Sequence, residues 1–209
     1  KYKNLHSNNI TVISLFFWIY LILISFIAEN KFLSFRDALI FIRILFIPIL
    51  IFYFISVEKK HLKRIIFIIF IAVIFVTFDT LFQYTQYNSE FGFGKDLLGF
   101  KSDWYGRLTG PFGDELIPGA YLSKFSLIGL IFIFSKYENT KHLKILSIIY
   151  LSIIGFVIFA SGERMAMATY LMGLFFLLIF YQNKRIIFIS SLFLIIILSY
   201  GSTKIHPFY

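Results

Sequence analysis

The sequence contains no cysteine, and only 15% of its 209 residues are charged. The absence of cysteine excludes disulfide bonds, thiolate metal sites and cysteine nucleophiles. Soluble globular domains carry about 25% charged residues, so the scarcity of charge excludes an ordinary soluble domain. Apolar residues make up 59% of the chain, and the mean hydropathy is +0.83. A body of 24.6 kDa cannot bury so much apolar surface in water, so the composition predicts an all-α, polytopic transmembrane helical bundle.

Seven apolar segments are long enough, or nearly so, to cross a bilayer, which takes about 20 helical residues. They cover residues 10–28, 38–57, 65–82, 116–134, 145–160, 165–181 and 186–200. The chain begins at Lys1 without a methionine and stops a few residues after the last apolar run. We therefore expect residues 1–209 to be a single integral membrane domain that is part of a longer protein.

The net charge of +9 is typical of nucleic-acid binding in soluble proteins, but in a membrane protein basic loops set the topology. If seven spans alternate in direction, eleven Lys and Arg residues fall on the side of the N-terminus and seven on the other. This excess predicts a cytoplasmic N-terminus with loops 58–64, 135–144 and 182–185. The one long loop, 83–115, then faces outward, and long loops in compact proteins are often functional.

The first candidate site lies at the end of this loop, in residues 107–124. It combines a Gly-rich turn (Gly110 and Gly113) with charged residues close to the start of a span. These are Arg107, Asp114, Glu115 and Lys124. A well-capped helix start, with its acids at the positive end of the helix dipole, would explain the pattern. Charges clustered so close to lipid also favour a binding site, because they are costly unless they pair or bind a ligand.

The second candidate is the short connection Ser161, Gly162, Glu163 and Arg164 between two spans, on the same predicted side as Arg107. A plain turn with a snorkelling arginine is one interpretation. The other is a guanidinium held rigidly at a helix start, where its planar fork can bind phosphate oxygens.

Polar residues within the spans form a third, supporting set. Asp79 and Gln83 lie four residues apart on one face of the third span, and Arg43 lies inside the second. An Asp79–Arg43 pair would satisfy both charges, either by joining helices or by supporting a site. The four histidines show no metal-ligand spacing, and no nucleotide-binding pattern is present, so we expect neither metal nor cofactor nor nucleic-acid partner.

The two arginine motifs together resemble the bacterial O-antigen ligase/polymerase family. The segment Arg107-Leu-Thr-Gly-Pro-Phe-Gly-Asp-Glu115, a span, a basic loop, another span and Ser161-Gly-Glu-Arg164 follow the order of that family over roughly residues 79–181. The chain departs from the family pattern in two places: Gly113-Asp114-Glu115 replaces an Asn-Pro-Asn-like segment, and Glu163 precedes the second arginine. Family members are also about twice as long and carry a further loop with a histidine motif that this chain lacks.

The resemblance implies metal-independent glycan transfer at the periplasmic face of the bacterial inner membrane. The donor would be a sugar chain on undecaprenyl diphosphate, and the acceptor either lipid A–core (ligase) or a growing polysaccharide (polymerase). The resemblance assigns Arg164 and Arg107 to the diphosphate, which needs preorganised cationic donors as its charge develops. Glu163, Asp114 or Glu115 would act as a base or orient those arginines, while Gly110, Gly113, Ser161 and Lys124 would line the substrate site. This chain alone, without the histidine loop, is expected to be inactive.

Two other classes of function remain open from the sequence. A transporter or channel would place charges near the bilayer midplane, whereas the charges here gather near one face. A non-enzymatic membrane scaffold would have no need for charged, Gly-rich motifs on one side only.

Overall fold

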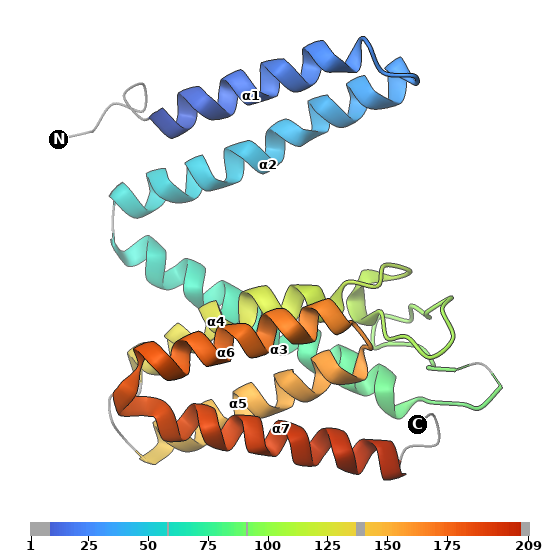
Figure 1. Cartoon of the computed structure of the whole chain (residues 1–209), viewed down its shortest axis with the longest axis vertical. Helices are drawn as coiled ribbons and strands as arrows, with labels where there is room; N and C mark the ends of the chain where they lie inside the picture. Colours follow the sequence, from blue (N-terminus) through green and yellow to red (C-terminus); the bar gives the residue numbers. More distant parts are fainter. Residues whose placement is uncertain (1–8, 58, 91, 137–140, 206–209) are drawn as a thin grey trace. The chain divides into compact units, whose positions relative to one another are not determined.

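The computed structural model of the protein describes residues 9–57, 59–90, 92–136 and 141–205. These residues form α-helices and no β-sheet, which confirms the predicted all-α helical bundle (Figure 1). The helices are α1 (Asn9–Ser25), α2 (Lys31–Val57), α3 (Lys59–Thr85), α4 (Pro118–Lys136), α5 (Lys141–Ala160), α6 (Arg164–Phe180) and α7 (Arg185–Ile205). Two short 3₁₀ helices, η2 (Gly110–Phe112) and η3 (Gln182–Lys184), complete the described elements.

Among the described residues the structure has about four membrane spans rather than the expected seven. Within the described residues, four helices are long and apolar enough to cross a bilayer: His61–Thr85, Pro118–Lys136, Lys141–Ala160 and Gln182–Lys204. The apolar helix α6 has 17 residues, which at 1.5 Å per residue is about 25 Å and short of the bilayer core of about 30 Å. The apolar part of α1 is shorter still (Val12–Ser25). The four long apolar helices indicate a membrane protein in a lipid bilayer.

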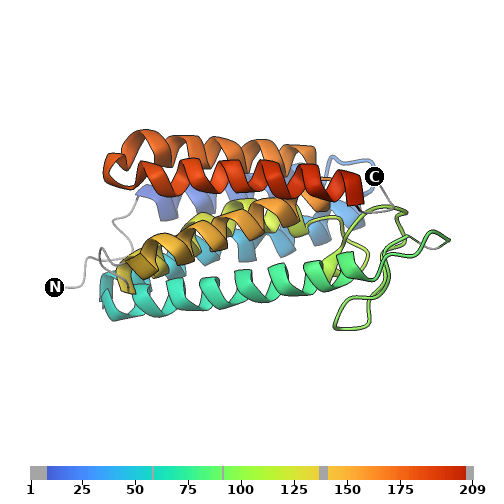
Figure 2. The ribbon, with the colours of Figure 1, turned by 90° about the horizontal axis from the view of Figure 1, so that it is seen from below.

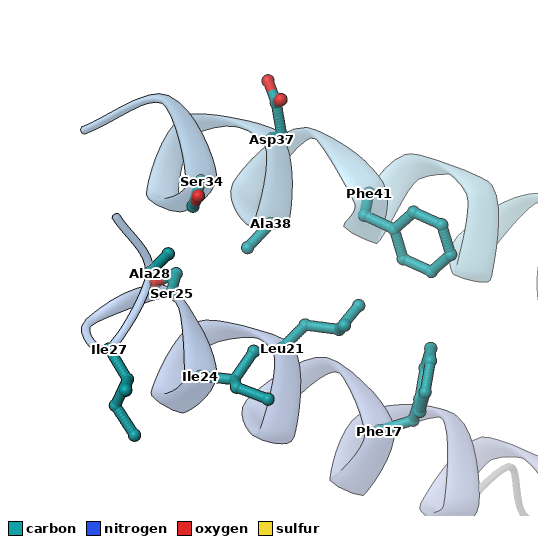
Figure 3. Close-up of a pocket in the computed structure, with 10 residues that line it drawn as sticks. All are labelled: Phe17, Leu21, Ile24, Ser25, Ile27, Ala28, Ser34, Asp37, Ala38 and Phe41. Carbon is teal, nitrogen blue, oxygen red and sulfur yellow. The ribbon is translucent and has the colours of Figure 1, made fainter. Parts of the chain in front are cut away.

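The chain divides into two units, one ending at Leu62 and the other beginning at Lys63. In the first unit α1 and α2 form a hairpin, in which the Trp18 indole donates to the Ala38 carbonyl at 3.0 Å. A hollow of about 570 Å³ lies between these two helices. Its lining residues, drawn in Figure 3, are mainly apolar. The carboxylate of Asp37 points away from α1 in this view and pairs with Arg36 at 3.2 Å. The hollow therefore offers apolar surface rather than reactive groups.

The second unit is a bundle of α3 to α7 around one apolar core. Its deeply buried apolar residues come from all five helices and include Val73, Leu122, Leu130, Leu151, Ile154, Ile158, Tyr170, Leu174 and Phe188. Two buried tyrosines are satisfied by backbone carbonyls of neighbouring helices: Tyr150 donates to Ser126 at 2.9 Å and Tyr170 to Leu151 at 2.7 Å. Such bonds matter in an apolar interior because an unpaired buried hydroxyl is costly.

Successive helices of this unit run in opposite directions, so its connections gather at two ends (Figures 1 and 2). We call one the loop end: it holds residues 86–117, which follow α3, and the turn 161–163 between α5 and α6. The opposite end carries Lys136, Lys141, Lys144, Lys184 and Arg185, and we call it the basic end. Both arginine motifs thus lie at the loop end of one compact unit.

Candidate functional site

Gln83, in the last turn of α3, anchors the long loop. Its side-chain oxygen accepts the backbone N–H groups of Thr109 and Gly110, each at 2.9 Å. Its amide nitrogen donates to the Gly94 carbonyl and to the Thr109 hydroxyl, each at 3.3 Å. The side chain is fully buried, so one amide holds two distant parts of the loop against α3. That Gln83 supports a functional site stays a prediction.

Gly110 is packed too tightly to receive a ligand. It adopts φ +51°, and a Cβ there would lie 2.4 Å from the Thr80 hydroxyl of α3. A side chain is excluded both by this contact and by the left-handed backbone. Gly113 also has a positive φ of +66°, but nothing lies within 4 Å of its Cβ position. Of the two predicted ligand-binding glycines, only Gly113 has open space beside it.

Asp79, one turn before Gln83, also binds the loop. Its Oδ1 accepts the Leu97 N–H at 2.9 Å, and its side chain is fully buried. Arg43, its expected partner, has a side chain that lies outside the described residues, so the Asp79–Arg43 pair stays a prediction. The observed partner is a loop residue, because the loop folds back over the end of α3.

Arg107 joins the loop to the α5–α6 turn. Its Nη1 donates to the carbonyl of Ser161 at 3.5 Å and, in a closer contact, to the carbonyl of Gly162. Gly162 adopts φ +73°, and a Cβ at this position would lie 2.6 Å from Nη1. Glycine is therefore required for the guanidinium to reach the turn. The two arginine motifs, 54 residues apart in sequence, are neighbours in space as the shared-site hypothesis requires.

Glu163 makes a second bridge, from the same turn to α4. Its two carboxylate oxygens accept the N–H groups of Gly119 at 2.7 Å and Ala120 at 2.9 Å, in the first turn of α4. These N–H groups have no partner within the helix. A carboxylate is also favoured there by the positive end of the helix dipole. Gly119 allows the approach, because a Cβ on it would lie 2.6 Å from the Ser161 hydroxyl and 2.9 Å from Glu163 Oε1.

Asp114 and Glu115 do not take the place at the helix start that the sequence suggested. The helix begins at Pro118, two residues later than the predicted span, and both acidic side chains are exposed. Because Glu163 reaches across from another turn, it occupies the position where a local acid would cap the helix.

The pKa of Glu163 reflects opposing effects. Burial raises its pKa, whereas the N–H groups of Gly119 and Ala120 and the positive charge of Arg107 lower it, so that the pKa lies above its ordinary value. The carboxyl is therefore strongly engaged by its surroundings, and both of its oxygens are occupied.

The remaining predicted site residues differ in how accessible they are. Arg164 opens α6 with an exposed side chain that has no hydrogen-bond or ionic partner among the residues placed here. Lys124, in the second turn of α4, is also exposed. Ser161 is buried, and its hydroxyl donates to the Ile158 carbonyl at 2.8 Å. Arg164 and Lys124 are thus open to a ligand, whereas Ser161 shapes the turn.

Comparison of the chain with protein-family models, with curated proteins and with solved structures finds no match.

Proposed function

We propose that this protein is an integral membrane glycan transferase of the O-antigen ligase/polymerase type. It would move a sugar chain from undecaprenyl diphosphate to an acceptor hydroxyl, either on lipid A–core or on a growing polysaccharide. One observation carries the proposal: Arg107 hydrogen-bonds to the turn that leads directly to Arg164. Two guanidinium-bearing motifs thereby meet at one end of a membrane bundle, beside the N-terminus of α4.

A diphosphate leaving group suits this arrangement. As the acceptor oxygen bonds to the anomeric carbon, the bond from that carbon to the diphosphate oxygen breaks, and negative charge builds on the diphosphate. Preorganised cationic donors stabilise such a charge. Arg164 is exposed and can turn its planar fork onto phosphate oxygens. Arg107 has Nη1 engaged by the turn, which leaves Nε and Nη2 for the ligand.

The acidic residues then divide into two roles. Glu163 has both oxygens bound to α4, so we assign it to positioning the turn that bears Arg164. Asp114 and Glu115 are exposed beside the open face of Gly113. Either of them can take the proton that the acceptor hydroxyl loses. Lys124 is accessible as a further cation for the donor.

The proposal places the chain in the bacterial inner membrane, with the loop end periplasmic and the basic end cytoplasmic. The gathering of Lys136, Lys141, Lys144, Lys184 and Arg185 at one end supports this orientation. Reporter fusions at Lys60 and Asp103 test it, and a cytoplasmic signal from the Asp103 fusion would contradict the proposal.

The function is tested by changing Arg164 in the gene of the native host. We expect Arg164→Lys and Arg164→Ala to lower glycan transfer about 10²- to 10³-fold, the usual cost of removing one preorganised donor. Lysine keeps the charge but loses the two-pronged fork, so it should not rescue transfer. Transfer is measured as polymer or ligated lipopolysaccharide on gels, together with the amount of protein in the membrane.

The matched control is Lys144→Ala at the basic end, where the side chain is exposed. Lys184 is less suitable, because its Nζ lies 3.6 Å from the centre of the Phe134 ring and its removal would also disturb packing. If the Arg164→Ala variant transfers glycan normally, Arg164 is only a snorkelling residue. The proposal would then depend on Arg107 alone.

A further inference from the structure

Two buried carboxyl groups meet under the loop, apart from the arginines. Asp79 in α3 is 0% exposed and Asp96 in the loop is 4% exposed. Each uses Oδ1 to accept a backbone N–H, from Leu97 at 2.9 Å and from Phe100 at 2.6 Å respectively. Each also has a buried Oδ2 without a hydrogen-bond partner. We call these two residues the aspartate pair.

Asp79 accepts the N–H of Leu97, the residue that follows Asp96, so the loop brings the two carboxyl groups together against α3. If both were ionised, two like charges would face each other in an apolar interior, which is strongly unfavourable. If one carries a proton, its Oδ2–H donates to the Oδ2 of the other. A single proton then satisfies both orphaned oxygens and removes the repulsion. Carboxyl pairs that share one proton in this way are a known solution to this electrostatic problem.

We propose that Asp79 and Asp96 form a proton-binding site, in which one proton shared between the two Oδ2 atoms at neutral pH fastens the loop to α3. The pair then carries one negative charge in total. Together with the bonds to Leu97 and Phe100, the shared proton ties the turn 96–100 to the helix. This inference does not depend on the proposed glycan transfer.

A neutral residue, Gly110, lies beside the pair: its Cβ position is 3.6 Å from Asp79 Oδ2. The charged residues flanking Asp96 along the loop are Lys95 and Lys101, and both of their side chains are exposed. Both Oδ2 atoms of the pair are buried away from solvent.

A metal ion is a poorer explanation than a proton. Calcium takes six to eight oxygen ligands and magnesium six, whereas the pair offers two free oxygens. Among the described residues, no group of three His, Asp or Glu side chains is placed to hold a metal. A proton needs only the two oxygens that are present.

Infrared spectroscopy of the full protein in lipid nanodiscs at neutral pH tests the proposal directly. A protonated carboxylic acid has a carbonyl band distinct from that of a carboxylate. We expect the wild type to show this band and both Asp79→Asn and Asp96→Asn to lose it, because either change leaves the other aspartate alone and ionised. Asparagine keeps the shape and supplies an N–H donor in place of the proton, so the loop should stay in position.

The matched control is Asp103→Asn, an exposed carboxyl in the same loop, which should keep the band. A wild type without the band would overturn the proposal, as would a band that either pair variant retains. If Asp79→Asn fails to fold, Asp96→Asn, which lies in the loop and not in a helix, decides the question. Adding Ca²⁺ or Mg²⁺ to the wild type should leave the band unchanged, and its loss would identify a cation site instead.

Discussion

Gly119→Ala is the sharpest test of how the two arginine motifs are held together. Gly119 lies in the first turn of α4 without a positive φ, so alanine fits the backbone there. Alanine improves helix propensity by about 0.5–1 kcal/mol over glycine. Its methyl group, however, would lie 2.6 Å from the Ser161 hydroxyl and 2.9 Å from Glu163 Oε1. Propensity and packing therefore predict opposite effects.

The magnitudes favour packing. If Glu163 moves away, the N–H groups of Gly119 and Ala120 lose their acceptors. At about 0.5–1.5 kcal/mol for each hydrogen bond, the loss is about 1–3 kcal/mol. If Glu163 stays, overpacking costs a similar amount, about 1–3 kcal/mol. Subtracting the gain in propensity leaves about 0–2.5 kcal/mol. From the middle of this range we expect the contact between α4 and the α5–α6 turn to weaken by about 1–2 kcal/mol.

Hydrogen exchange of the protein in nanodiscs measures this directly, because opening of the contact exposes the N–H groups at positions 119 and 120. A loss of about 1–2 kcal/mol corresponds to exchange about 5- to 30-fold faster. Gly201→Ala is the control: Gly201 lies in α7 with nothing within 4 Å of its Cβ position, so alanine should not speed exchange. In a Glu163→Ala background, Gly119→Ala should lose the part of its effect that comes from Glu163 and keep the part that comes from its contact with Ser161. Exchange in Gly119→Ala that is as slow as in the wild type would refute the reasoning.

Two further predictions concern the loop and the turn. Gln83→Ala leaves the N–H groups of Thr109 and Gly110 buried without an acceptor, at about 1–3 kcal/mol each. Limited proteolysis should then cut residues 86–113 faster, whereas Gln86→Ala, at an exposed side chain, should not change cleavage. Burial raises the pKa of Glu163 and Arg107 lowers it, so Arg107→Leu should raise this pKa further, measured by titrating the carboxyl with NMR. An unchanged pKa of Glu163 in Arg107→Leu would contradict the assigned contact. Since the folded-state pKa of Glu163 lies above the ordinary value, the contribution of this carboxyl to stability is present at low pH and is lost as pH rises through the folded-state pKa.

The helices were largely predictable from the sequence because apolar runs are the strongest local signal in a membrane protein. Each of the seven predicted segments overlaps a helix, and 145–160 lies wholly within α5. Their ends were less predictable. The third segment was expected at 65–82, whereas α3 runs from Lys59 to Thr85, since lysine and arginine end an apolar run but continue a helix readily. Two of the expected spans are not among the four found in the described residues because α1 and α6 have only 17 residues each.

The site was predictable only in part. The proximity of Arg107 to the 161–164 turn followed from placing both motifs on the same side of the membrane. The partner of α4 was not predictable, because Glu163 is more than forty residues away from Gly119 and the local acids Asp114 and Glu115 offered a simpler cap. The pairing of Asp79 with Asp96 likewise depends on the course of the loop, which carries no periodic pattern.

The α5–α6 turn also has a consequence for the order of assembly during synthesis. Arg107 and the first turn of α4 leave the ribosome well before Ser161, Gly162 and Glu163, which supply their hydrogen-bond acceptors. Until the α5–α6 hairpin enters the membrane, the N–H groups of Gly119 and Ala120 must be solvated by water or lipid headgroups. Completion of the loop end is therefore a late event, and an early pause before residue 161 should leave α4 in the bilayer with its N-terminal turn frayed.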